Sequence, residues 1–203
     1  MPSRPRQRRI TWTLALLACL VWMPARAFTT VVIDAGHGGK DPGCHGHDVR
    51  EKDLCLDVAK RLQKLLEAKE VKTVMTRTED VFVALHERAL VSNQQPDAIF
   101  VSIHFNACRD HSISGLEVHY RSKKGRALAG CIREGLRKEV KGRHRDGDWE
   151  DYKVLRETQA AAVLVECGFI SNASEAARCA DPDHRQSLAQ GIASGILEAK
   201  TKL

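Results

Sequence analysis

Short apolar runs recur along the chain after residue 28 and divide it into regular segments. Runs rich in β-branched residues occupy positions 29–34, 71–76, 98–104, 116–120 and 162–166. Their length and composition are typical of strands that are buried on both faces of a sheet. We therefore predict a strand at each of these five positions.

Between the first two strands the apolar residues follow a helical period instead. In the segment 51–69 they recur at Leu54, Val58, Leu62, Leu65 and Leu66. This spacing predicts a helix with one buried face. Further helices are predicted over 84–93, 125–140 and 184–200. Strands that alternate with helices indicate an α/β sandwich around a mostly parallel sheet.

The polar segment 141–155 interrupts this alternation. It is rich in glycine and charged residues, so we predict a loop, with a short edge strand over 152–155 as the alternative. The chain shows no internal repeat and no low-complexity tract. Its 203 residues suit one domain, for which we expect the bounds 28–203.

The first 27 residues have the organisation of a secretory signal peptide. A basic stretch, RPRQRR, precedes the apolar run ITWTLALLACLVWM, and Ala25 and Ala27 place small residues where a signal peptidase cleaves. The apolar run is shorter than the roughly 20 residues that a membrane-spanning helix needs. We therefore predict a signal peptide over 1–27 and a periplasmic or extracellular protein. An uncleaved membrane anchor and a lipoprotein modified at Cys19 are the alternatives.

The net charge of +6 comes from this N-terminal segment. Residues 1–27 contain five arginines and no acidic residue, which leaves 27 basic and 26 acidic residues in the rest of the chain. A domain so close to neutral does not have the positive excess that is typical of nucleic-acid binding. We therefore expect no nucleic-acid partner.

Six cysteines follow the signal segment, and none belongs to a C-x-x-C pair, which argues against a structural zinc knuckle. In an exported protein they can form up to three disulfides, although some can equally be small buried apolar residues. The sequence does not rank the pairings among Cys44, Cys55, Cys108, Cys131, Cys167 and Cys179.

Three of the predicted strands end in residues that can act chemically. His37 follows the first strand in a glycine-rich turn, His104 ends the third strand, and Glu166 ends the fifth. Because ligands of open α/β sheets bind beyond the carboxyl ends of the strands, we expect these side chains at one edge of the sheet. Glu51, in the first turn of the helix after the glycine-rich turn, faces the same edge.

This group of side chains is suited to metal-assisted hydrolysis. Two imidazoles and one carboxylate are the ligands of many catalytic zinc sites, with water in the fourth position. Zinc lowers the pKa of that water to about 7, and a second carboxylate can take its proton and pass it to a leaving amine. Glu166, on its own strand, is the natural base. Glycines at 36, 38 and 39 would let a bulky substrate come close.

Six motifs resemble those of the zinc-dependent N-acetylmuramoyl-L-alanine amidases. They occur in order over about residues 30 to 200, which makes the resemblance much more specific than a glycine pattern alone. The motifs are VVIDAGHGGKDPG at 31–43, EKD at 51–53, TR at 76–77, SIHFNA at 102–107, GLEVHY at 115–120 and VLVECGFISN at 163–172.

The resemblance implies a fold, a cofactor and a reaction. It implies an α/β domain whose twisted, mixed and mostly parallel sheet is flanked by helices on both faces. It implies that His37, Glu51 and His104 bind one zinc ion per chain and that Glu166 is the catalytic acid–base. The implied reaction is hydrolysis of the amide between N-acetylmuramic acid and L-alanine of the peptidoglycan stem peptide, in cell-wall remodelling or daughter-cell separation.

Some members of the family carry an inserted helix between the second histidine and the last glutamate, which blocks the site until an activator removes it. Here residues 105–165 are taken up by a predicted strand, a helix and a loop. We therefore expect no such helix, no need for that kind of activator, and a monomer. The expected partner is peptidoglycan, and the membrane is contacted only by the signal segment.

Several neighbouring residues have two interpretations. Asn106 and Ser102 can orient ligands or substrate, or make ordinary hydrogen bonds at a strand end. His45 can line the substrate groove or be a solvated loop residue. Cys167 should point away from Glu166, because neighbouring strand residues face opposite sides of a sheet, and this disfavours a cysteine nucleophile.

Two other functions stay open from the sequence. One is a zinc peptidase that cuts within the stem peptide. The other is a wall-binding module without activity, against which the presence of all four proposed active residues argues.

Overall fold

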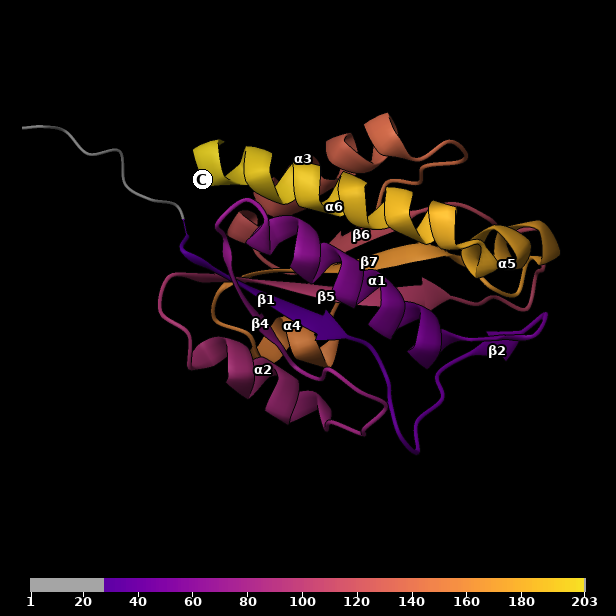
Figure 1. The fold of residues 1–203 in the computed structure, drawn as a ribbon, viewed down its shortest axis with the longest axis horizontal. Helices are drawn as coiled ribbons and strands as arrows, with labels where there is room; N and C mark the ends of the chain where they lie inside the picture. Colours follow the sequence, from indigo (N-terminus) through magenta and orange to yellow (C-terminus); the bar gives the residue numbers. More distant parts are fainter. Residues whose placement is uncertain (1–27, 203) are drawn as a thin grey trace, which may run out of the picture.

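A five-stranded sheet forms the centre of the protein (Figure 1). The computed structural model describes residues 28–202, so the predicted signal peptide over 1–27 lies outside the described residues. The strand order is β4-β1-β5-β7-β6. The bounds are Thr30–Ala35 for β1, Lys72–Met75 for β4, Ala98–Asn106 for β5, Glu117–Tyr120 for β6 and Ala161–Phe169 for β7.

Strand β1 pairs in parallel with both β4 and β5, and β5 pairs in parallel with β7. Only β6, at one edge of this sheet, runs antiparallel to its neighbour β7. The predicted mixed, mostly parallel sheet is confirmed, and all five predicted strands are present to within a few residues.

Helices cover both faces of the sheet, as Figure 1 shows, with α1, α3 and α6 on one face and α2 and α4 on the other. A short helix, α5, packs against α6 and β7. The bounds are Glu51–Glu67 for α1, Leu85–Asn93 for α2, Lys123–Glu139 for α3, Lys153–Glu157 for α4, Ala173–Ala180 for α5 and Pro182–Lys202 for α6. Within residues 28–202 no helix is both long and apolar enough to cross a bilayer.

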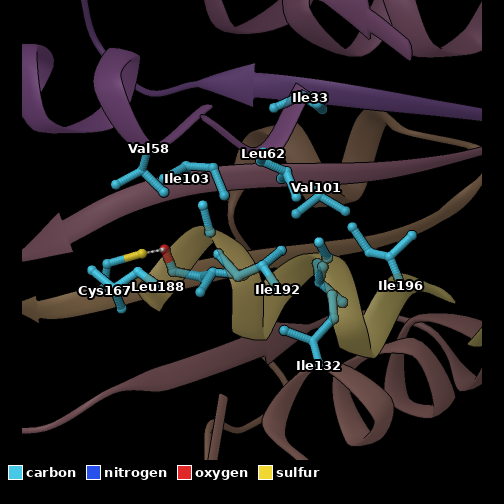
Figure 2. Packing of buried hydrophobic residues seen from close by; sticks show 14 of the residues in the cluster. Ile33, Val58, Leu62, Val101, Ile103, Ile132, Cys167, Leu188, Ile192 and Ile196 are labelled. Carbon is cyan, nitrogen blue, oxygen red and sulfur yellow. Dashed lines mark hydrogen bonds between the residues drawn. The ribbon is translucent and has the colours of Figure 1, made fainter. Parts of the chain in front are cut away.

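The larger part of the core lies between the sheet and the face that carries α1, α3 and α6. Ile33, Val101 and Ile103 point from the sheet toward this side, where they meet Leu62 of α1 and Ile192 of α6 (Figure 2). Cys167 is also buried in this cluster. Because β-strand side chains alternate between faces, the residue before it, Glu166, points to the opposite side, as expected.

A smaller apolar cluster lies on the opposite face. Phe100 and Leu164 of the sheet pack there against Val154 and Leu155 of α4. The alternative of an edge strand over 152–155 is therefore wrong. Val154 and Leu155 are consecutive and both buried, which a helix lying on a sheet allows and a half-exposed edge strand does not.

The rest of the polar segment is a loop that covers the free edge of β6. Leu116 and Tyr120 form isolated bridges with His144 and Trp149 of this loop. This pairing protects a sheet edge that would otherwise be open to another chain. A two-stranded hairpin, with β2 at His45–Gly46 and β3 at Val49–Arg50, was not predicted. All six cysteines of the described chain are unpaired, with Cys44 and Cys108 exposed and the other four buried.

Candidate metal and active site

His37, Glu51 and His104 come together at the carboxyl end of the sheet. One donor atom from each lies within 4.8 Å of the others. The three residues come from the turn after β1, the first turn of α1 and the end of β5. The sequence prediction that these strand ends converge is thus met by the geometry.

The carboxylate of Glu51 is the centre of this group. Its Oε1 lies 3.0 Å from His37 Nε2 and 2.9 Å from His104 Nδ1, and it accepts a hydrogen bond from the Phe105 amide at 3.1 Å. The Cys44 amide donates to the other oxygen, Oε2, at 2.8 Å. Burial alone would raise the pKa of Glu51, but the two imidazoles outweigh it and hold that pKa well below its usual range. The group therefore keeps a negative charge that attracts a cation.

The ring of His37 is fixed from its far side. Its Nδ1 donates to Asp41 Oδ2 at 2.9 Å, and this bond leaves Nε2 turned toward Glu51. A carboxylate behind a ligating histidine sets the tautomer and orientation of the ring. The sequence analysis missed Asp41, although its position four residues after His37 in HGGKD was a usable signal.

Two glycines leave room for this arrangement. A Cβ atom on Gly36 would lie 2.5 Å from both Cε1 and Nε2 of His104. A Cβ atom on Gly43, whose φ is +66°, would lie 2.6 Å from Glu51 Oε2. The glycine-rich turn is therefore required by the packing of the three side chains themselves, in addition to any substrate.

A buried ion pair supports the turn that carries His37. Arg88 Nη1 lies 2.8 Å from Asp34 Oδ1, and Arg88 Nη2 donates to the backbone oxygen of His37 at 2.7 Å. Ser102 donates to the other oxygen of Asp34 at 2.6 Å. Ser102 thus contacts Asp34, the residue that holds the supporting arginine, and its role in orienting ligands or substrate stays a prediction.

Glu166 stands beside this group without a partner for one of its oxygens. It is 7% exposed, and its Oε2 is buried with no hydrogen bond. Burial, together with the negative charges of Glu51 and Glu117, raises the pKa of Glu166 well above its usual range. Burial and these two charges therefore both favour the protonated form of the Glu166 carboxyl.

His37, Glu51, His104 and Glu166 all line one pocket of about 340 Å³. Its walls are completed by Leu85 of α2 and by Tyr152, Lys153 and Val154 at the start of α4. The same two helices cover the smaller apolar cluster, so the pocket lies on the face of the sheet that carries this cluster.

The remaining predicted residues take different positions. Asn106 lines the pocket and donates to Glu117 Oε2 at 3.2 Å. Glu117, which the sequence analysis missed, is the antiparallel register partner of Glu166 and also binds Arg145 Nε at 2.6 Å. His45 is exposed on the hairpin, where it pairs with Arg50, and it does not line the pocket.

Comparison with known proteins gives consistent matches over this region. A family model described as N-acetylmuramoyl-L-alanine amidase matches residues 31–198. A Staphylococcus aureus protein described as "Probable cell wall amidase LytH" is 37% identical over 170 residues, which cover 82% of this chain and 57% of that protein. The chain thus spans less than two thirds of that relative.

Solved structures share the fold. The catalytic domain of the amidase CwlV from Bacillus (Paenibacillus) polymyxa var. colistinus superposes with a TM-score of 0.81 at 35% identity, covering 84% of this chain and 97% of that one. The amidase AmiC2 of Nostoc punctiforme gives 0.80 at 35% identity, with 83% and 95% covered. The amidase CwlD from Clostridioides difficile, solved in complex with the GerS lipoprotein, gives 0.82 at 28% identity, with 86% and 100% covered.

Proposed function

This chain belongs to the N-acetylmuramoyl-L-alanine amidase family, and from that premise we propose that it hydrolyses the amide between N-acetylmuramic acid and L-alanine in peptidoglycan. The observation that carries the proposal is the group of His37, Glu51 and His104 next to the unpartnered carboxyl of Glu166 in one pocket. A ligand group and a separate proton-transfer group are what amide hydrolysis by a metal enzyme needs.

We propose that the three-residue group holds one Zn²⁺ ion. Two imidazoles and one carboxylate are a donor set of catalytic zinc sites that keep one position open. The low pKa of Glu51 supports this assignment, since the group favours positive charge. A bound zinc ion would supply Lewis acidity, which lowers the pKa of water and polarises the amide carbonyl. His37 and His104 would hold it from two sides, with Asp41 fixing the His37 ring.

Glu166 is the proposed general base and acid. Its unpartnered Oε2 accepts the proton of the attacking water, and it then gives this proton to the nitrogen of the leaving L-alanine. The raised pKa of Glu166 suits the second step, because a carboxyl that binds its proton firmly is present in the acid form. With a divalent cation held by Glu51 and the two imidazoles, Glu166 would meet less repulsion and could ionise for the first step.

The test is a digest of purified peptidoglycan by the recombinant chain, with and without a chelator, followed by mass spectrometry of the products. Free amino groups on L-alanine together with intact glycan strands are expected, and the chelator should stop their release. New termini between residues of the stem peptide would instead identify a peptidase and contradict the proposal.

We also propose that the protein is exported through residues 1–27 and acts in the periplasm or outside the cell, as a monomer that needs no activator. Of the elements between β5 and β7 in the described chain, only α4 contributes to the pocket wall. N-terminal sequencing of the mature protein should begin near Phe28. Light scattering should give the mass of one chain, with full activity of the purified protein alone.

A further inference from the structure

Lys153 is the one lysine or arginine that lines the pocket in the described part of the chain. The other titratable groups there include the carboxyls of Glu51 and Glu166 and the imidazoles of the ligand group. Lys153 comes from α4, a different element from any of these. The pocket therefore offers one flexible basic side chain, separate from the proposed metal position.

The present partner of Lys153 is easily replaced. Its Nζ lies 3.2 Å from Glu157 Oε1, and the two side chains are 44% and 34% exposed. Exposed ion pairs of this kind contribute little to stability, and a lysine placed before its glutamate on a helix is the less favourable order. An anionic group of a bound substrate can therefore take the place of Glu157 at little cost.

We propose that Lys153 binds a carboxylate of the peptide part of the substrate and makes the enzyme prefer stem peptides with a free acid over amidated ones. This inference rests on the proposed function, because it assigns the substrate to a muramoyl peptide. In such a compound the N-acetylated sugar is neutral, and the lactyl carboxyl is used up in the cleaved amide. The remaining negative charge lies on the peptide, so the peptide runs along the wall formed by α4.

The test uses two soluble substrates that differ only in charge. Both are N-acetylmuramoyl dipeptides with L-alanine first and a dicarboxylic amino acid second; in one the two carboxyls are free, and in the other both are carboxamides. The native enzyme should cleave the acid with a kcat/KM about tenfold higher, the size of one hydrogen-bonded charge pair. The variant Lys153→Gln should lose this preference by slowing on the acid alone, whereas Lys153→Arg should keep it.

Glu157→Gln is the matched control. It breaks the same ion pair and the same helical contact, but it leaves the lysine in the pocket, so the preference for the acid should persist. Equal losses on both substrates in Lys153→Gln, or no loss on either, would overturn the inference.

Binding separates this inference from the proposed function. The variant Glu166→Gln should bind substrate without cleaving it. Isothermal titration calorimetry then measures the affinity of each dipeptide for this variant and for the double variant that also carries Lys153→Gln. Tighter binding of the acid that depends on Lys153 supports the inference even if neither compound is cleaved, in which case only the proposed reaction fails. Equal binding of the two compounds to the variant with Lys153 intact contradicts it.

Discussion

Glu166 and His104 are direct register partners on the parallel strands β7 and β5. Both side chains therefore leave the sheet on the same face and at the same level, so that a proposed proton-transfer group stands beside a proposed metal ligand. Their relative position is set by backbone hydrogen bonds of the sheet and not by a flexible loop.

Because Glu166 is outside the ligand group, removing its charge should separate catalysis from metal binding. The variant Glu166→Gln keeps the shape of the side chain, and we expect kcat to fall by about 10²- to 10⁴-fold, the range for loss of general acid–base catalysis. Zinc content, measured by atomic absorption, should stay near one ion per chain. Retention of full activity would exclude Glu166 from the chemical step.

The same substitution should change how the stability of the metal-free protein depends on pH. The pKa of Glu166 is raised by burial and by the carboxylates of Glu51 and Glu117, so the folded chain keeps a proton that the unfolded chain releases above about pH 4.5. The contribution of this group is fully present below that pH and is lost as the pH rises toward the folded pKa, by at most about 1.4 kcal/mol per pH unit.

Glu166→Gln removes this loss. Urea unfolding in the presence of a chelator should therefore show the variant gaining stability relative to the native chain between pH 4 and pH 8. A difference that stays constant over this range would mean that the carboxyl is not held protonated.

Asp41 should act on the metal through His37. Because Asp41 accepts the hydrogen bond from His37 Nδ1, Asp41→Ala should weaken zinc binding by about 10- to 100-fold, as for other carboxylates behind a metal-bound histidine. Competition with a chromogenic chelator measures this affinity. Asp151→Ala, which removes an exposed carboxylate far along the chain that pairs with Arg121, is the control and should leave the affinity unchanged.

The buried pair of Asp34 and Arg88 should matter for stability. Asp34→Asn leaves the Arg88 guanidinium buried without its counter-charge, and we expect a loss of about 3–5 kcal/mol in the free energy of unfolding. Ser102→Ala removes one hydrogen bond to the same carboxylate and should cost less, about 1.5–3 kcal/mol. Chemical denaturation of both variants gives this order, and a reversed order would contradict the role assigned to the pair.

A methyl group at Gly36 should disturb the site. The new Cβ would lie 2.5 Å from the His104 ring, so Gly36→Ala should displace this ring, lower the zinc affinity and cost about 1–3 kcal/mol of stability through overpacking. The control is Gly130→Ala on α3, where a Cβ meets nothing within 4 Å. Because glycine is a poor helix former, that change should stabilise the chain by about 0.4–1 kcal/mol in thermal unfolding.

The five strands of the central sheet, four of the six helices of the described chain and the convergence of three strand ends could be predicted from the sequence. The apolar runs and the helical spacing in 51–69 depend on local periodicity, and parallel strands oblige their carboxyl ends to share one edge. The motifs around His37, His104 and Glu166 could also be recognised, because each motif is a continuous stretch of the sequence.

The contacts that complete the site depended on tertiary structure. Nothing local pairs Arg88 with Asp34, or sets Glu117 opposite Glu166, because these residues are far apart in sequence and meet only through the strand order and register. The segment 152–155 shows the same limit, since Val154 and Leu155 form a helix where the surface of the sheet gives them an apolar partner. The sequence alone thus determined which residues we propose for the chemistry. Tertiary structure decided the pocket around these residues, because helices α2 and α4 form part of its wall only when they pack on the sheet. The same packing brought Lys153 to the pocket wall.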